Sequence, residues 1–150
     1  MYTILSTSGL NNFVLDIYAC IYISKIQHLK FIFYKAMSII KEKVNTDGIE
    51  IFEKAIEKAG AAGGKILYGG SSIEGSGNYV NPTIIKAENQ WEIVQEETFS
   101  CILYIMTYSD LDEAIEMHNN VPQGLSSAMF TLNMRHAEKF LSSVGSDCGI

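Results

Sequence analysis

Two adjacent glutamates and a nearby phenylalanine, Glu96, Glu97 and Phe99, are the residues of this 150-residue chain best suited to chemistry. They come directly before the apolar run Cys101–Tyr108, which predicts a buried strand. Paired carboxylates can serve as a general acid and base, and one carboxylate can accept two hydrogen bonds from a vicinal diol. Ligands of α/β proteins bind at strand ends, so this loop is the first candidate site. The alternative is that both glutamates are solvated charges and that Phe99 belongs to the core.

The cysteines and histidines give no metal motif. Cys20, Cys101 and Cys148 form no C-x-x-C pair, and the three histidines form no H-x-x-x-H pair. An odd number of widely spaced cysteines fits a reducing compartment and predicts no zinc site. Apolar residues follow Cys101, and no base or cation stands beside Cys148. Neither thiol is therefore expected to be a nucleophile.

Residues 44–150 alternate between helical and strand patterns. Helices are predicted at 47–59, 109–118 and 133–141, and strands at 65–68, 78–85, 101–108 and 125–131. Asp47, Ser109 and Asn133 are the expected helix caps. The glycines at 69–70 and 75–77 predict turns, because they do not form a G-x-G-x-x-G motif. This order predicts an α/β fold with a partial, largely parallel sheet.

The first 43 residues differ from the rest in charge and composition. They carry a balance of +3, whereas residues 44–150 carry −9. Lysines interrupt their apolar stretch, and the first basic residue is Lys25, which argues against a membrane span or a signal peptide. The segment is either an irregular apolar cover or not native coding sequence. The acidic remainder has no basic patch, so no nucleic-acid partner is expected.

Four short motifs occur in a recognisable order. They are Gly77–Ile84, Glu96–Phe99, Asn119–Ser127 and Phe130–Thr131. Over residues of about 44–150 the chain resembles the NAD(P)-dependent aldehyde dehydrogenase superfamily, and part of its catalytic domain. The ending Gly145–Ile150, together with Thr98, is most similar to the α-aminoadipic semialdehyde dehydrogenase branch.

The resemblance implies a role for two residues of the loop. Glu97 would hydrogen-bond both hydroxyls of the nicotinamide ribose of NAD, and Phe99 would lie against the nicotinamide, whereas Glu96 would have no role. One departure concerns the following residues. The family usually has a small residue and a proline there, but this chain has Ser100 and Cys101, and the loss of proline frees the backbone of the turn.

Full-length relatives oxidise an aldehyde, here of the aminoadipate semialdehyde type used in lysine catabolism. The resemblance implies a nucleophilic cysteine in a G-Q-x-C stretch and a base in an E-L-G-G stretch, and this sequence contains neither. The chain is therefore expected to be an inactive fragment that keeps the ribose contact. The alternative is a non-catalytic interaction module or a remnant. Relatives imply a homo-oligomer, in the cytoplasm or in mitochondria, and no membrane.

Overall fold

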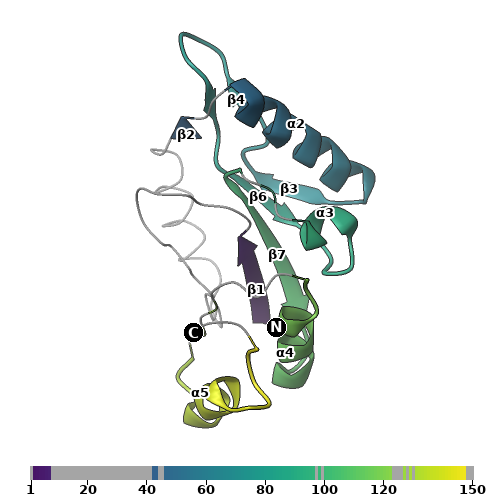
Figure 1. The fold of residues 1–150 in the computed structure, drawn as a ribbon, viewed down its shortest axis with the longest axis vertical. Helices are drawn as coiled ribbons and strands as arrows, with labels where there is room; N and C mark the ends of the chain where they lie inside the picture. Colours follow the sequence, from purple (N-terminus) through teal and green to yellow (C-terminus); the bar gives the residue numbers. More distant parts are fainter. Residues whose placement is uncertain are drawn as a thin grey trace. The chain divides into compact units, whose positions relative to one another are not determined.

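The computed structural model describes residues 2–7, 42–43, 46–96, 98, 100–122, 127, 129 and 131–147 (Figure 1). These residues belong to two compact units. One contains residues 2–5 together with those from Met106 onward, and the other contains residues 6–7 together with those from 42 to Ile105. The helices are α2 (Thr46–Ala61), α3 (Glu92–Gln95), α4 (Leu111–Asn119) and α5 (Met134–Leu141). The strands are β1 (Tyr2–Thr7), β2 (Glu42–Lys43), β3 (Lys65–Tyr68), β4 (Ser72–Ile73), β5 (Tyr79–Val80), β6 (Thr83–Lys86) and β7 (Ile102–Tyr108).

The strands form a four-stranded sheet in the order β1-β7-β6-β3 and a small antiparallel sheet in the order β2-β5-β4. β6 and β7 run parallel, whereas β3 and β6 run antiparallel. The predicted α/β class is confirmed, and β7 is an internal strand as expected. The sheet is mixed rather than largely parallel, because a helix-free connection returns the chain from β3 to β6 in the opposite direction.

α2 is amphipathic, as its sequence period predicts. Phe52, Ala55 and Ala59 are buried on one face, while Glu50 and Lys54 form an ion pair on the exposed face. The helix begins at Thr46, so the prediction of Asp47 as its cap is wrong. Asp47 instead lies in the first turn, where the helix dipole favours a carboxylate.

The predicted strand at 78–85 is divided at Pro82 into β5 and β6, since proline has no N–H to donate to a sheet. The side chain of Thr83 connects the break between β5 and β6 to the turn that follows β3. Its buried hydroxyl accepts a hydrogen bond from the Gly70 N–H at 2.8 Å and donates one to the Asn81 carbonyl at 2.8 Å. Gly69 and Gly70 both have positive φ, which confirms the predicted turn.

β7 alternates between deeply and partly buried side chains. Ile102, Tyr104 and Met106 are almost fully buried. The strand begins at Ile102, one residue later than predicted, although the Cys101 carbonyl still accepts the Thr83 N–H at 2.9 Å. The predicted polar loop after β3 contains the short strand β4, and the predicted strand at 125–131 falls mostly outside the described residues.

A reciprocal pair of hydrogen bonds begins α4. The Asp110 carboxylate accepts from the Glu113 N–H at 3.0 Å, and the Glu113 carboxylate accepts from the Ser109 N–H at 2.6 Å. The cap is therefore Asp110 and not Ser109 as predicted, because Ser109 contributes only its backbone to this capping box.

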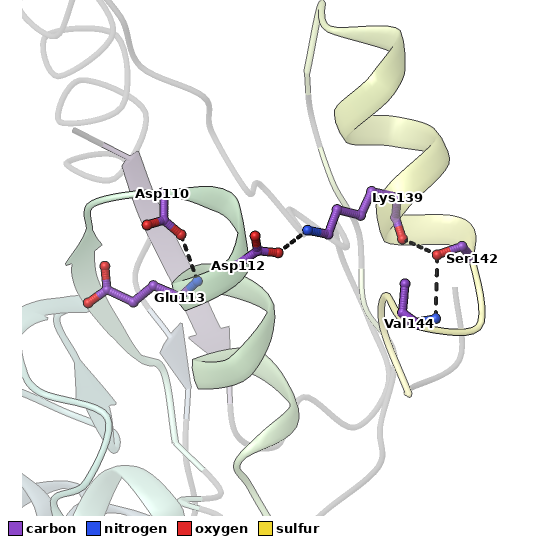
Figure 2. Close-up of polar contacts among 6 residues, drawn as sticks. All are labelled: Asp110, Asp112, Glu113, Lys139, Ser142 and Val144. Carbon is purple, nitrogen blue, oxygen red and sulfur yellow. Dashed lines mark hydrogen bonds and ion pairs between the residues drawn. The ribbon is translucent and has the colours of Figure 1, made fainter.

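Figure 2 shows Asp110 and Glu113 together with Lys139 of α5, which forms an ion pair with Asp112. The predicted Asn133 cap of α5 is confirmed, since its side chain accepts from the Arg135 N–H.

The Thr83 hydroxyl can be removed without changing the shape of the side chain. Thr83→Val should lower the free energy of unfolding by about 1–3 kcal/mol, because it leaves the Gly70 N–H and the Asn81 carbonyl without this partner. Thr107→Val changes an exposed threonine of β7 and should alter stability by less than about 0.5 kcal/mol. Urea denaturation followed by the fluorescence of Trp91, the single tryptophan, measures both. Equal effects would contradict the bridging role of Thr83.

Asp110 and Asp112 allow a capping bond to be compared with an ion pair on the same helix. Asp110→Ala should cost about 1 kcal/mol through loss of the cap. Asp112→Ala removes an exposed ion pair and should cost less than about 1 kcal/mol. Because salt screens exposed charges, the Asp112→Ala effect should shrink between low and high ionic strength, whereas the Asp110→Ala effect should largely persist. Denaturation at two salt concentrations tests this difference, and the opposite salt dependence would refute it.

Candidate functional site

The two predicted cofactor-binding residues, Glu97 and Phe99, lie outside the described residues, so their roles stay predictions. Their neighbours Glu96, Thr98 and Ser100 are described. The loop leaves α3 at Glu96, whose N–H donates to the Glu92 carbonyl at 2.9 Å, and it enters β7 at Ile102. The candidate site is therefore defined by the residues on either side of the predicted pair.

Glu96 is an exposed charge. Its carboxylate lies 3.3 Å from the Lys58 Nζ of α2, and both side chains are about half exposed (52% and 56%). An ion pair with this exposure contributes little to stability. The interpretation of Glu96 as a solvated charge agrees with this geometry, and a paired-carboxylate acid–base site gains no support from it.

The turn from Thr98 to Ile102 is held by its own backbone. The Ser100 N–H donates to the Thr98 carbonyl at 2.5 Å, and the Ile102 N–H donates to the Ser100 carbonyl at 2.9 Å. Each bond joins residues two apart in the sequence, and the second, across Cys101, has the pattern of a γ-turn. The expectation of a freer backbone around Phe99, where proline is missing, falls outside the described residues and stays a prediction.

Three residues of this turn and of β7 carry buried hydroxyls. The side chains of Thr98, Ser100 and Tyr104 are all buried, with exposed fractions of 5%, 7% and 1%. Burial raises the pKa of the Tyr104 hydroxyl, and the nearby Thr98 side chain opposes this shift. Sequence reasoning missed the cluster, although the even spacing of these residues ahead of and within a strand is a usable signal for one shared face.

Cys101 is half-buried rather than fully buried as expected. Among the residues that the structure describes, no three His, Cys, Asp or Glu side chains gather closely enough to hold a metal ion. Within the same residues, no helix is long and apolar enough to cross a membrane.

Two motifs of the sequence meet at the end of α4. The Asn119 Nδ2 donates to the Gly145 carbonyl at 2.8 Å, and the Asn119 Oδ1 accepts from the Asp147 N–H at 3.2 Å. Ser127 and Ser146 are joined by a hydrogen bond of 2.8 Å between their hydroxyls. The structure thus connects the Asn119–Ser127 motif to the Gly145–Asp147 turn, a contact that the sequence pattern alone did not indicate.

His118 stands beside the same turn. Its Nε2 lies 2.9 Å from the Ser146 Oγ, and its ring centroid lies 5.8 Å from that of Phe140 on α5. Burial lowers the pKa of His118, and the nearby charge of Asp147 partly opposes this shift. The ring of His118 is half-buried and has a polar partner.

Gly145 is required by the close approach of the turn to α5. A Cβ at this position would overlap the carbonyl oxygens of Lys139 and Phe140. Gly145→Ala should therefore destabilise the chain by about 1–3 kcal/mol, as overpacked sites do. In contrast, a methyl group added at Gly60 of α2 would meet open space, so Gly60→Ala should stabilise by about 0.5–1 kcal/mol. Thermal or urea denaturation of both variants checks the sign, and a stabilising Gly145→Ala would contradict the crowding.

Comparison with known proteins gives a consistent result. Residues 43–150 match the Aldehyde dehydrogenase family. Aldehyde dehydrogenase family 7 member A1 of Malus domestica is 48% identical over 101 residues, which are 67% of this chain and 20% of that protein. Alpha-aminoadipic semialdehyde dehydrogenase of Mus musculus is 42% identical over 103 residues, which are 68% of this chain and 19% of that protein.

A solved structure supports the same assignment. Indole-3-acetaldehyde dehydrogenase of P. syringae, in complex with NAD+, is similar with a TM-score of 0.60 and 32% identity, over 63% of this chain and 20% of that one. The chain spans about a fifth of the length of the relatives it matches. The resemblance predicted from the motifs is confirmed, including the branch. The chain belongs to the aldehyde dehydrogenase family.

Proposed function

We propose that this chain supplies the nicotinamide-ribose contact of an NAD-dependent aldehyde dehydrogenase, with Glu97 as the ribose ligand and Phe99 beside the nicotinamide. The observation that carries the proposal is the match of residues 43–150, which include Glu97 and Phe99, to the aldehyde dehydrogenase family. The neighbouring side chains of Thr98 and Ser100 are buried. The NAD+ complex of the P. syringae relative supports the choice of cofactor.

The chemistry of the two residues suits the cofactor. An ionised carboxylate has two acceptor oxygens, which match the two hydroxyl donors of a ribose, and such charge-assisted hydrogen bonds are short and strong. A flat apolar ring can orient the nicotinamide. When bound, the nicotinamide would accept a hydride from the substrate. NADP has the same nicotinamide ribose, so this contact serves both cofactors.

The activity proposed for the complete protein is oxidation of an aldehyde to a carboxylic acid. Relatives named for the α-aminoadipic semialdehyde suggest that class of substrate. The residues present here contain neither the G-Q-x-C nor the E-L-G-G stretch, and we propose that this chain binds the cofactor without oxidising an aldehyde. In this proposal residues 44–150 form part of the catalytic domain, residues 1–43 lie outside it, and the complete protein is a cytoplasmic or mitochondrial homo-oligomer.

One observation favours a second function, that of an interaction module. β3 is the outer strand of the four-stranded sheet, and its Ile66 is 42% exposed. An outer strand with an exposed apolar side chain can pair with a strand of another chain. This function needs neither Glu97 nor Phe99.

Glu97 and Glu96 provide a matched test of cofactor binding. Glu97→Gln keeps the shape of the side chain but removes its charge, and should weaken NAD binding about tenfold or more, since hydrogen bonds to charged groups contribute about 1.5–3 kcal/mol. Glu96→Gln should leave the affinity unchanged, because Glu96 pairs with Lys58. Isothermal titration of each purified variant with NAD measures both. Equal weakening by both variants, or no binding by the unaltered chain, would reject the proposal, and self-association without NAD binding would favour the interaction module.

A further inference from the structure

Tyr104 carries a hydroxyl group that the packing of β7 does not need. Its side chain is 1% exposed, and among the described residues no group forms a hydrogen bond with its Oη. We propose that Tyr104 is a positioning residue of the loop between α3 and β7, and that its hydroxyl holds the Thr98 side chain and so orients the flanking Glu97 and Phe99 for the cofactor. This role rests on the proposed function of Glu97 and Phe99 as cofactor-binding residues.

The burial of the Tyr104 hydroxyl is unfavourable by itself, because the group gives up its hydrogen bonds to water. Phenylalanine at this position would fill nearly the same space without that cost. The next buried side chains along the same face of β7, those of Ile102 and Met106, are apolar. The hydroxyl therefore serves a contact other than the packing of the strand.

Thr98 is the partner that the structure favours. Its side chain is also buried, with 5% exposed, and it lies close enough to the Tyr104 hydroxyl to oppose the rise in pKa that burial causes. A neighbouring hydroxyl lowers the pKa of a phenol because it can donate a hydrogen bond to the ionised oxygen. Each of the two hydroxyls can donate or accept, and their hydrogens rotate to suit a partner.

The path of the backbone allows two residues that are six positions apart to approach each other. The Ser100 N–H donates to the Thr98 carbonyl at 2.5 Å, and the Ile102 N–H donates to the Ser100 carbonyl at 2.9 Å. These bonds shorten a segment that would rise by about 3.3 Å per residue if it were extended. Tyr104 itself lies in the paired part of β7, opposite Ile85 of β6. The ring therefore stands on a fixed strand, and its hydroxyl meets a residue of the loop.

Thr98 stands directly between Glu97 and Phe99 in the chain. Its backbone is therefore joined to both predicted cofactor-binding residues, and a restraint on its side chain limits the directions that its neighbours can take. Binding groups must be held within a fraction of an ångström of their working geometry by the residues that support them. The Tyr104 hydroxyl is thus expected to affect the affinity for NAD without touching the cofactor.

Tyr104→Phe removes the hydroxyl and keeps the ring. It should weaken NAD binding about two- to tenfold, the range that one neutral hydrogen bond contributes, and should leave the urea midpoint of the cofactor-free chain unchanged or raised. Thr98→Val should weaken binding by a similar factor, and the double variant by no more than either single variant, because all three remove the same contact. Tyr79→Phe alters a half-buried tyrosine of β5 and should leave the affinity unchanged.

Isothermal titration with NAD and urea denaturation measure these effects. A merely structural role for the Tyr104 hydroxyl would lower the urea midpoint together with the affinity, and that result would overturn the proposal. An unchanged affinity in Tyr104→Phe, or effects that multiply in the double variant, would overturn it as well.

A measurement without NAD separates this role from the proposed function. Hydrogen exchange at the amides of Ser100 and Ile102, whose bonds close the turn, should be about two- to tenfold faster in Tyr104→Phe and in Thr98→Val. The Ala87 amide, which donates a hydrogen bond to β7, is the internal reference and should not change.

If the unaltered chain binds no NAD, the proposed function fails, and the exchange rates alone decide whether Tyr104 holds the loop. Faster exchange at the two turn amides would then support the restraint. Unchanged exchange at both would overturn it, whether or not the chain binds NAD.

Discussion

The parallel pairing of β6 with β7 is the interaction on which the candidate site depends. The pairing sets Thr83 opposite Ile102 and Ile84 opposite Leu103, and it is extended at both ends by backbone hydrogen bonds from Thr83 to Cys101 and from Ala87 to Ile105. The loop that carries the predicted ribose ligand enters β7 at the first of these pairs. The point at which the loop enters the sheet is therefore set by the register of β7. A slip of β7 by one residue would move all of its side chains to the opposite face of the sheet.

Thr83 links this register to the other end of β6. Its backbone pairs with the strand that receives the candidate loop, while its hydroxyl binds the glycine turn that follows β3. The motif that contains Thr83 thus connects two turns that are distant in sequence. The burial of such a polar side chain is stable only because both its donor and its acceptor are used.

Local patterns predicted most of the elements. The helical period placed α2, α4 and α5, and the apolar runs placed β3 and β7, because these features depend on neighbouring residues. The cap of α4 was misplaced by one residue because Ser109 and Asp110 can both cap a helix, and only the position of Glu113 distinguishes them. The antiparallel pairing of β3 and the contact of Asn119 with the Gly145 turn were not predictable, since both join residues far apart in the chain. Glu97 and Phe99 were predicted from a motif, and their roles stay predictions.

Asn119 and His118 restrain the same three residues in different ways. Asn119 binds only main-chain atoms of Gly145 and Asp147. These two hydrogen bonds therefore do not depend on which side chains the turn carries. His118 binds a side chain, and its contribution exists only while a hydroxyl stands at position 146. Substitution of Ser146 would therefore remove the contact of His118, while the bonds of Asn119 to the backbone of the turn would be kept.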